Sequence, residues 1–281
     1  MEKEIEVMKR IYSVLFFIPA LLFCLSCNDQ LDKENLFDGT DRIVCAEVSR
    51  LSSDNSVDDN GEETIESIRA YLFDEGVLVK KYTDIKHSGN RYEFPLEALR
   101  GNLYIVANDT RLPDFGSPEP GYSEEEWKAT VIHSTNGQAE MVYTGVVSLA
   151  DYTAADRLIP VSLKRVAARF DLRMAVAGTA EVKSITFKRV QKAAYLFPQS
   201  TVATPEGSSA IDIPLVPEEP YTASENGILY LYEQDNADLK VALNASIDGK
   251  EYSLETNLPE KISRNTVYSI TCLLYTSPSP R

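Results

Sequence analysis

The chain has 281 residues and a formal net charge of −15, from 43 acidic and 28 basic side chains. This excess of acid argues against binding to nucleic acid, whose phosphates require clusters of Lys and Arg, and against charge-driven adhesion to anionic lipid. It is typical of a solvated, self-repelling surface.

The N-terminal segment is typical of a bacterial lipoprotein. Met8-Lys9-Arg10 leads into the apolar run Ile11 to Leu25, which is shorter than the roughly 20 residues of a transmembrane helix. Ser26 then precedes Cys27, so we expect residues 1–26 to be a signal peptide, with translation starting at Met8. Cys27 would carry the lipid, palmitate included, although Cys24 stands where such signals usually have Leu. An uncleaved membrane anchor is the alternative.

The mature chain then passes from a tether into a strand. Residues 27–41 are polar and acidic, which predicts a flexible tether between lipid and fold. Arg42 to Leu51 alternates as a strand does, and Ser52 to Glu63 is a loop rich in turn formers. Part of this loop, Ser56 to Gly61, is similar to a calcium loop, but Ser67 stands where the bidentate Glu is needed, so an acidic solvated loop is the preferred interpretation.

Short β-rich runs fill most of the remaining chain. Ile68 to Phe73 and Val77 to Tyr82 flank an Asp-Glu-Gly turn and predict a hairpin. Further strands are expected at Tyr92 to Leu96, Asn102 to Ala107, Met141 to Leu149, Ile159 to Leu163, Ala168 to Val176, Val182 to Val190, Ile228 to Tyr232, Leu239 to Ile247, Glu251 to Leu254 and Val267 to Thr271. Regularly spaced short strands favour a sandwich or barrel.

Two segments interrupt this pattern. Ser123 and Glu126 form a capping box, which predicts a short helix with Trp127 on its apolar side. The proline-rich, acidic stretch Thr204 to Thr222 predicts a long surface loop.

The last ten residues, 272–281, read CLLYTSPSPR and contain no acid. They match the translation of a common sequencing-library adapter, so we expect the natural protein to continue differently after Thr271. Since Cys24 leaves with the signal peptide and Cys27 takes lipid, Cys45 is then the one remaining cysteine, and no intramolecular disulfide is expected.

The residues offer little for catalysis. His87 and His133 are the two histidines, both in polar contexts, and neither a nucleophile elbow nor a zinc-binding motif is present. The paired acids Glu218 and Glu219 lie between prolines, with nothing to bring them opposite a second pair. We therefore expect no catalytic residue, no metal and no cofactor, and a protein that is not an enzyme.

The order of local motifs resembles the fimbrillin family, the subunits of type V pili in anaerobic Gram-negative bacteria. The motifs are Ile65 to Val79, Leu103 to Asn108, the helix around Trp127, Met141 to Leu149, Val161 to Leu172, Leu229 to Glu233 and Ile262 to Ile270. Taken alone, each is also compatible with a generic strand, and the charges Lys164, Arg165 and Arg169 with solvent-facing side chains.

The resemblance implies a mainly β fold of two tandem antiparallel, transthyretin-like β-sandwich domains, at 42–166 with the short helix and at 167–271 with its C-terminal end truncated. It implies export through the periplasm to the outer membrane and cell surface, with other fimbrial subunits as partners and with Cys27 anchored in lipid.

The resemblance also implies how such subunits assemble. An arginine-specific protease would cut between Arg50 and Leu51 and remove the first strand, whose apolar residues are Ile43, Val44, Ala46 and Val48. A strand from another subunit would then add to the exposed edge. Arg42 is a second candidate cut site.

Other functions remain open. An anchor or tip subunit of the pilus would keep its first strand. A glycan- or peptide-binding lipoprotein would present aromatic residues such as Tyr122, Trp127 and Tyr143 on one exposed surface, which distinguishes it from an assembly subunit.

Overall fold

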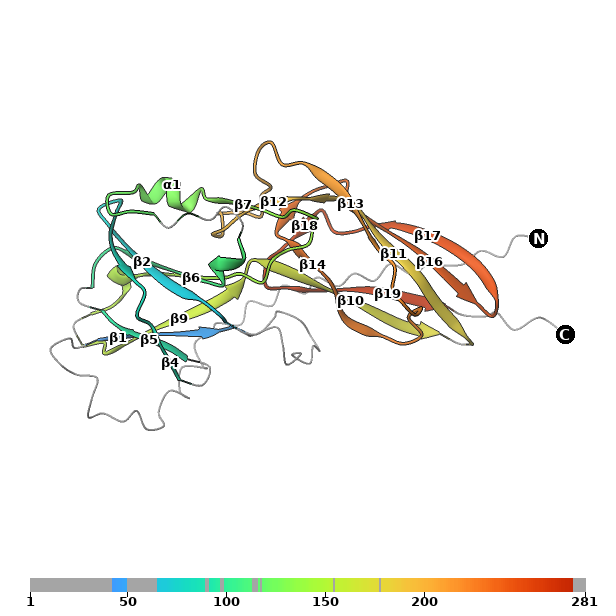
Figure 1. The fold of residues 1–281 in the computed structure, drawn as a ribbon, viewed down its shortest axis with the longest axis horizontal. Helices are drawn as coiled ribbons and strands as arrows, with labels where there is room; N and C mark the ends of the chain where they lie inside the picture. The colour runs from blue at the N-terminus through green and yellow to red at the C-terminus, as the bar shows by residue number, and fades with distance from the viewer. Residues whose placement is uncertain are drawn as a thin grey trace.

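A computed structural model describes residues 42–49, 65–88, 91–96, 99–112, 116, 118–153, 155–176 and 178–274. The molecule is elongated, and its two halves lie one after the other along the long axis (Figure 1). Strands dominate both halves, so the mainly β fold class expected from the sequence is confirmed.

The N-terminal half is one eight-stranded sheet in the order β3-β2-β6-β8-β9-β1-β5-β4. Its strands are β1 (Ile43–Val48), β2 (Ile68–Asp74), β3 (Val77–Tyr82), β4 (Lys86–Ser88), β5 (Arg91–Pro95), β6 (Asn102–Ala107), β8 (Tyr143–Ser148) and β9 (Leu158–Arg165). β8 and β9 share two residue pairs, and the apolar core takes side chains from both sides of this corner. The sheet therefore bends there into two layers around its core.

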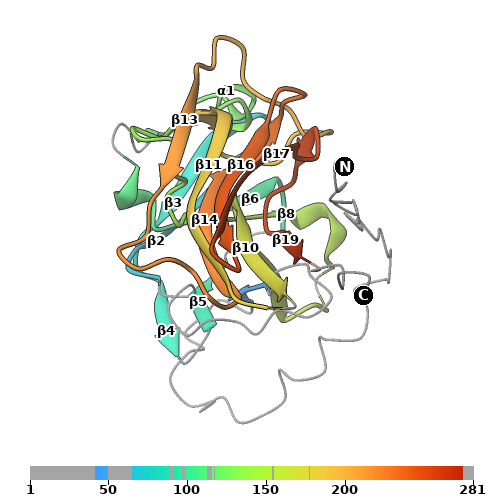
Figure 2. The ribbon, with the colours of Figure 1, turned by 90° about the vertical axis from the view of Figure 1, so that its right-hand side faces the viewer.

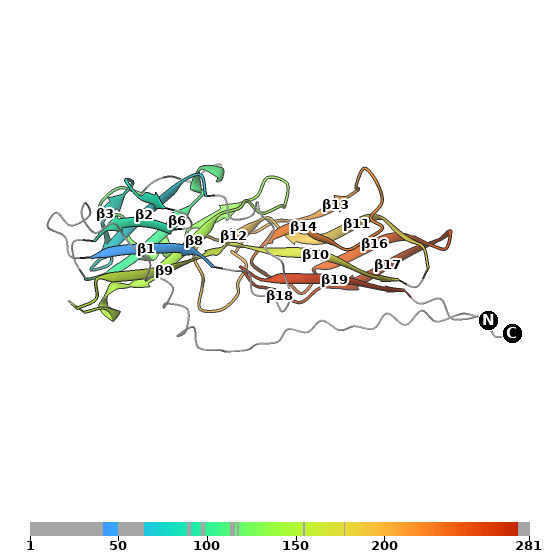
Figure 3. The ribbon, with the colours of Figure 1, turned by 90° about the horizontal axis from the view of Figure 1, so that it is seen from below.

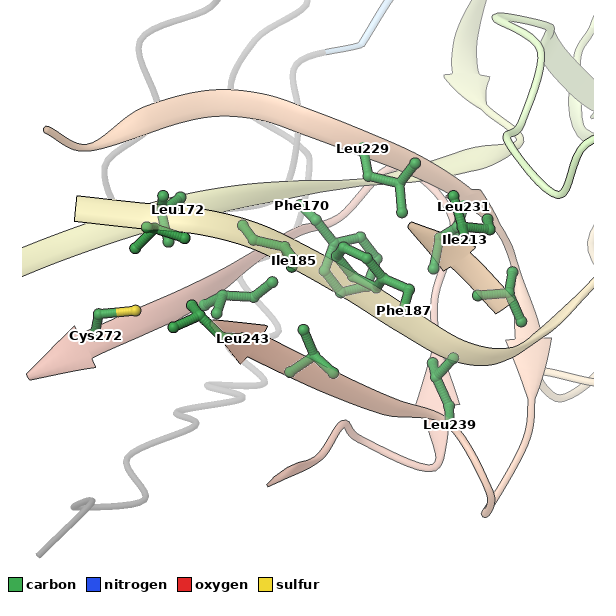
Figure 4. Close-up of a cluster of buried hydrophobic side chains, with 14 of the residues drawn as sticks. Phe170, Leu172, Ile185, Phe187, Ile213, Leu229, Leu231, Leu239, Leu243 and Cys272 are labelled. Carbon is green, nitrogen blue, oxygen red and sulfur yellow. The ribbon is translucent and has the colours of Figure 1, made fainter. Parts of the chain in front are cut away.

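The C-terminal half has two sheets. One has the order β14-β10-β19, from β10 (Ala167–Val176), β14 (Glu225–Tyr232) and β19 (Val267–Leu274). The other has the order β13-β11-β16-β17, from β11 (Ala180–Gln191), β13 (Ala210–Leu215), β16 (Lys240–Ile247) and β17 (Lys250–Asn257), and Figure 2 looks onto this end of the molecule. Apolar side chains of both sheets fill the space between them (Figure 4), with the Phe170 and Phe187 rings 5.1 Å apart at the centre.

The remaining elements are short, and some of them join the two halves. They are the 3₁₀ turns Asp109–Arg111 and Leu149–Asp151, helix α1 (Glu124–Lys128), and strands β7 (Val131–His133), β12 (Ala193–Tyr195), β15 (Gln234–Asp235) and β18 (Lys261–Ile262). β7 pairs with β12, and a third apolar cluster combines Tyr71, Trp127 and Phe197 with other side chains of both halves. The Trp127 and Phe197 ring centroids lie 5.2 Å apart, so the halves share a packed interface.

The two sharpest local predictions are confirmed. β2 and β3 form the expected hairpin, with Glu75 and Gly76 in its turn at positive φ. Helix α1 begins after Ser123, whose Oγ accepts a hydrogen bond from the Glu126 backbone N–H at 3.4 Å. That bond satisfies one of the backbone donors that a helix start leaves open.

Three expectations need correction. The sheets are not purely antiparallel, because β1 runs parallel to β9 and β10 runs parallel to β19. The stretch Thr204 to Thr222 is not one long loop, since it contains β13, which lies at a sheet edge, where Pro214 is tolerated, and packs Ile213 into the core. The strand expected at Val267 to Thr271 continues to Leu274 as β19. It therefore includes Cys272, and burial raises the pKa of the Cys272 thiol to about 11. The adapter origin of residues 272–281 stays a prediction.

Candidate functional site, the slot of strand β1

Strand β1 lies inside its sheet, between β9 and β5. It forms six residue pairs with β9 in parallel, from Ile43–Leu158 to Val48–Leu163, and five with β5 in antiparallel. Two backbone hydrogen bonds bound this ladder, from Ile43 N to Arg157 O at 2.9 Å and from Ser49 N to Leu163 O at 2.8 Å. The predicted first strand therefore exists, and removing it would leave two neighbouring strand edges unpaired.

One face of β1 belongs to the apolar core of the N-terminal half. Val44 and Ala46 are fully buried there, and Val48 packs against the same cluster. Across the ladder Val44 faces Phe94, and Ala46 faces Tyr92, a phenol whose pKa burial raises. Without β1, this part of the core would open to solvent.

The other face of β1 carries Ile43 and Cys45, which are also buried. The four residues proposed for the exchanged strand are thus divided between the two faces, with Val44, Ala46 and Val48 on one and Ile43 on the other. Cys45 belongs to this set as well. The uninterrupted apolar run Ile43 to Ala46 was a signal for it, because strands buried on both faces lose the alternation of half-buried ones.

The proposed modification sites lie outside the described residues. These are the lipid-carrying Cys27 and the cut site Arg50–Leu51, and the loop Ser56 to Gly61 falls there too. Arg42, the second candidate cut site, directly precedes β1, and its carbonyl accepts a hydrogen bond from Leu96 N at 3.1 Å.

The aromatic residues considered for a binding surface do not form one. Trp127 is 2% exposed and Tyr143 is fully buried, whereas Tyr122 is 39% exposed. Trp127 packs against Tyr71, with ring centroids 4.8 Å apart, under helix α1. These rings fill the core between the halves, which removes the feature that favoured a glycan- or peptide-binding module.

The charged residues near the junction between the halves are also more buried than the sequence indicates. Arg165 and Arg169 are 1% and 0% exposed. Arg169 Nε lies 2.9 Å from Asp171 Oδ1, and Asp171 also pairs with Arg173 at 2.7 Å. Arg169 and Asp171 are two residues apart on β10, so their side chains lie on the same face of the strand, opposite Phe170. An Arg and an Asp two positions apart in a predicted strand were therefore a sequence signal for this internal ion pair.

The histidines lie apart, His87 exposed on β4 and His133 exposed on β7. In the part of the chain that the structure describes, no three His, Cys, Asp or Glu side chains are grouped as metal ligands. Among the same residues, none of the helices has both the length and the apolar character that crossing a bilayer requires.

Comparison with solved structures relates the fold to fimbrial proteins. The tip fimbrial protein Mfa3 from Porphyromonas gingivalis, with C-terminal truncation, is similar at a TM-score of 0.53 and 13% identity, over 85% of this chain and 96% of that one. A putative cell adhesion protein from Bacteroides eggerthii gives 0.52 and 15%, over 84% and 87%. A fimbrilin from Porphyromonas gingivalis gives 0.47 and 14%, over 83% and 90%. No protein-family model and no curated protein matches the sequence. The chain has the β-sandwich fold of the first two of these proteins.

Proposed function

We propose that this chain is a non-catalytic structural subunit of a cell-surface fimbria, or pilus, that supports adhesion and assembles by exchange of strand β1. The observation that carries the proposal is the place of β1, which is buried on both faces and paired on both edges. The shared fold with a tip fimbrial protein and a cell adhesion protein supports it.

The energetics of β1 suit an exchanged strand. The space between β9 and β5 that β1 fills is called the slot of β1. Burying a Val side chain there contributes about 1.5–3 kcal/mol, and unmade backbone hydrogen bonds would add to the free-energy cost of leaving the slot empty. A subunit without β1 would therefore expose an apolar groove between β9 and β5, and would gain several kcal/mol by binding a strand of similar pattern. This is β-augmentation, in which main-chain hydrogen bonds give affinity and side-chain pockets give specificity.

The proposal includes a route to the empty slot. The precursor would be exported through the periplasm, acylated at Cys27 and held at the outer membrane, where other fimbrial subunits are its partners. Cleavage between Arg50 and Leu51 would free β1, because Arg50 immediately follows the end of the β1 ladder at Ser49. Cleavage after Arg42 would leave β1 in place, so the two sites have opposite consequences.

The alternative is a non-polymerising lipoprotein of the same fold, such as the anchor or tip subunit of a pilus. The similarity to a tip fimbrial protein favours it specifically. Such a subunit would keep β1 as an ordinary core strand.

Treatment of the full-length protein with an arginine-specific protease distinguishes these functions. The N-terminus is read by mass spectrometry and assembly by a gel ladder under mild denaturation. The variant Arg50→Lys keeps the charge but resists the protease, and Arg42→Lys is its matched control. We expect a new N-terminus at Leu51 and a ladder for the wild type and Arg42→Lys, and neither for Arg50→Lys.

Cleavage at Arg50 without a ladder would refute strand exchange. An acylated Cys27 that stays intact, with no ladder, would support the anchor or tip subunit instead.

A further inference from the structure

Strands β1 and β19 lie end to end along one continuous strand edge. β9 ends at Arg165 and β10 begins at Ala167, so the chain runs from one half into the other with Val166 between them. β1 pairs in parallel with β9, and β19 pairs in parallel with β10 (Figure 3). The opposite edge is continuous too, because Val166 N donates to Val142 O and Val166 O accepts from Glu233 N.

Asn265 occupies the gap between the two parallel ladders. It is 5% exposed and has a φ of +53°, in the left-handed region that Asn tolerates better than most residues. Its backbone N donates to Ala167 O at 2.9 Å, and its side-chain Oδ1 accepts from Arg165 N at 3.3 Å. Its Nδ2 donates to Ser49 Oγ at 3.3 Å, which links the end of β1 to the C-terminal half.

The side chain of Asn265 replaces the next backbone hydrogen bond that β1 would make with β9. In a parallel pair, evenly spaced backbone groups of one strand meet the other strand at alternate residues. Ser49 N donates to Leu163 O, so the next group on that edge of β9 is Arg165 N, which a longer β1 would meet with a carbonyl oxygen. Asn265 Oδ1 accepts the hydrogen bond from Arg165 N instead. The pairing between β1 and β9 therefore ends at Ser49.

We propose that Asn265 ends the slot of β1 and thereby fixes the register of the strand that occupies it. The register needs such a stop, because a shift by two residues keeps every side chain on its own face. The exposed pair of Arg91 and Glu47 contributes little against a shift. Sliding toward the C-terminal half would instead push backbone into the space of the Asn265 side chain.

Asn265 also restricts which strand sequence fits the slot of β1. A strand in this slot carries apolar residues at the positions of Val44, Ala46 and Val48, and a small hydroxyl residue at the position of Ser49. The Ser49 hydroxyl is both a hydrogen-bond donor and an acceptor, since it donates to Leu163 O at 3.1 Å and accepts from Asn265 Nδ2. For a strand of another subunit this specificity rests on the proposed function, whereas for β1 itself it does not.

Disulfide trapping in the uncut, full-length chain tests the stop. Cys45 lies opposite Glu93 in the observed register, and a two-residue slide toward Asn265 would bring it opposite Arg91. Glu93→Cys therefore reports the observed register and Arg91→Cys the shifted one, in equivalent geometry. Cross-links to Cys45 are identified by mass spectrometry of the linked peptides.

Asn265→Gly removes the side chain and keeps the backbone conformation. Loss of two hydrogen bonds is expected to raise the cross-link between Cys45 and the Arg91→Cys thiol by about tenfold. Asn265→Asp, which keeps an acceptor for Arg165 N, and Ser49→Ala, which leaves Oδ1 in place, are expected to retain the native cross-link.

An unchanged cross-link pattern in Asn265→Gly would overturn the inference. So would loss of both cross-links, which would mean that Asn265 holds β1 in the sheet without setting its register. Because the chain is uncut, these results are independent of assembly. A chain that keeps its register but forms no ladder after cleavage at Arg50 would refute the proposed function alone.

Discussion

Replacing Ala46 by Asp places a carboxylate at the centre of the β1 slot. Ala46 is fully buried, pairs with Tyr92 on one side and with Val161 on the other, and belongs to a cluster of apolar side chains. An uncompensated buried charge costs about 3–5 kcal/mol. Because the whole stability of a domain is about 5–15 kcal/mol, β1 is expected to leave the slot while the rest of the fold persists.

Hydrogen exchange followed by mass spectrometry measures this release directly. A cost of 3–5 kcal/mol predicts that the amides of residues 43–48 exchange faster by about a hundredfold or more, while those of β11, in the other core, stay as in the wild type. Glu47→Asp is the matched control, since it changes the next residue, whose side chain is 48% exposed, and keeps a carboxylate. Wild-type exchange rates at residues 43–48 in Ala46→Asp would refute the burial argument.

Two further predictions concern the support of this half. Gly101 and Gly76 have nearly equal φ values, +78° and +79°, but a Cβ at Gly101 would lie 1.9 Å from Phe73 O, whereas one at Gly76 meets nothing within 4 Å. In denaturant unfolding, the free energy of unfolding should fall by about 1 kcal/mol for Gly76→Ala and by several times more for Gly101→Ala. Equal decreases in the two variants would contradict this account. Burial raises the pKa of Glu124, but hydrogen bonds, first of all from Tyr104, outweigh it and hold that pKa below 4.5. The ionised Glu124 thus stabilises the fold above its unfolded pKa and loses this effect as pH falls through the folded pKa, so Glu124→Gln should flatten the acid side of the stability profile, and an unchanged slope would argue against this.

Local patterns in the sequence were sufficient to predict several elements. The hairpin of β2 and β3 and the capping box at Ser123 depend on residues close in sequence, and the structure contains both. Asn102 to Ala107 forms β6 with the expected bounds for the same reason. β13 was missed because Pro214 and its neighbouring prolines obscured the alternation of Ile211, Ile213 and Leu215.

Long-range features needed the three-dimensional structure. The parallel pairing of β1 with β9 joins residues more than 100 positions apart, and no local pattern indicates it. The same holds for Asn265, which meets Ser49 across 216 positions. Trp127 is typical of an exposed binding platform as much as of a core, and only the packing of α1 against the junction decides for the core.

The central claim is that the slot of β1 is the site of assembly, and refilling it with a peptide tests this most directly. Full-length protein is cleaved with the arginine-specific protease in the presence of a peptide with the sequence of residues 42–49, or of the same peptide with Asp in place of Ala46. The native peptide is predicted to suppress the ladder of oligomers, and the Asp peptide to leave it unchanged. A ladder that neither peptide affects, or that both suppress equally, would contradict assembly through this slot.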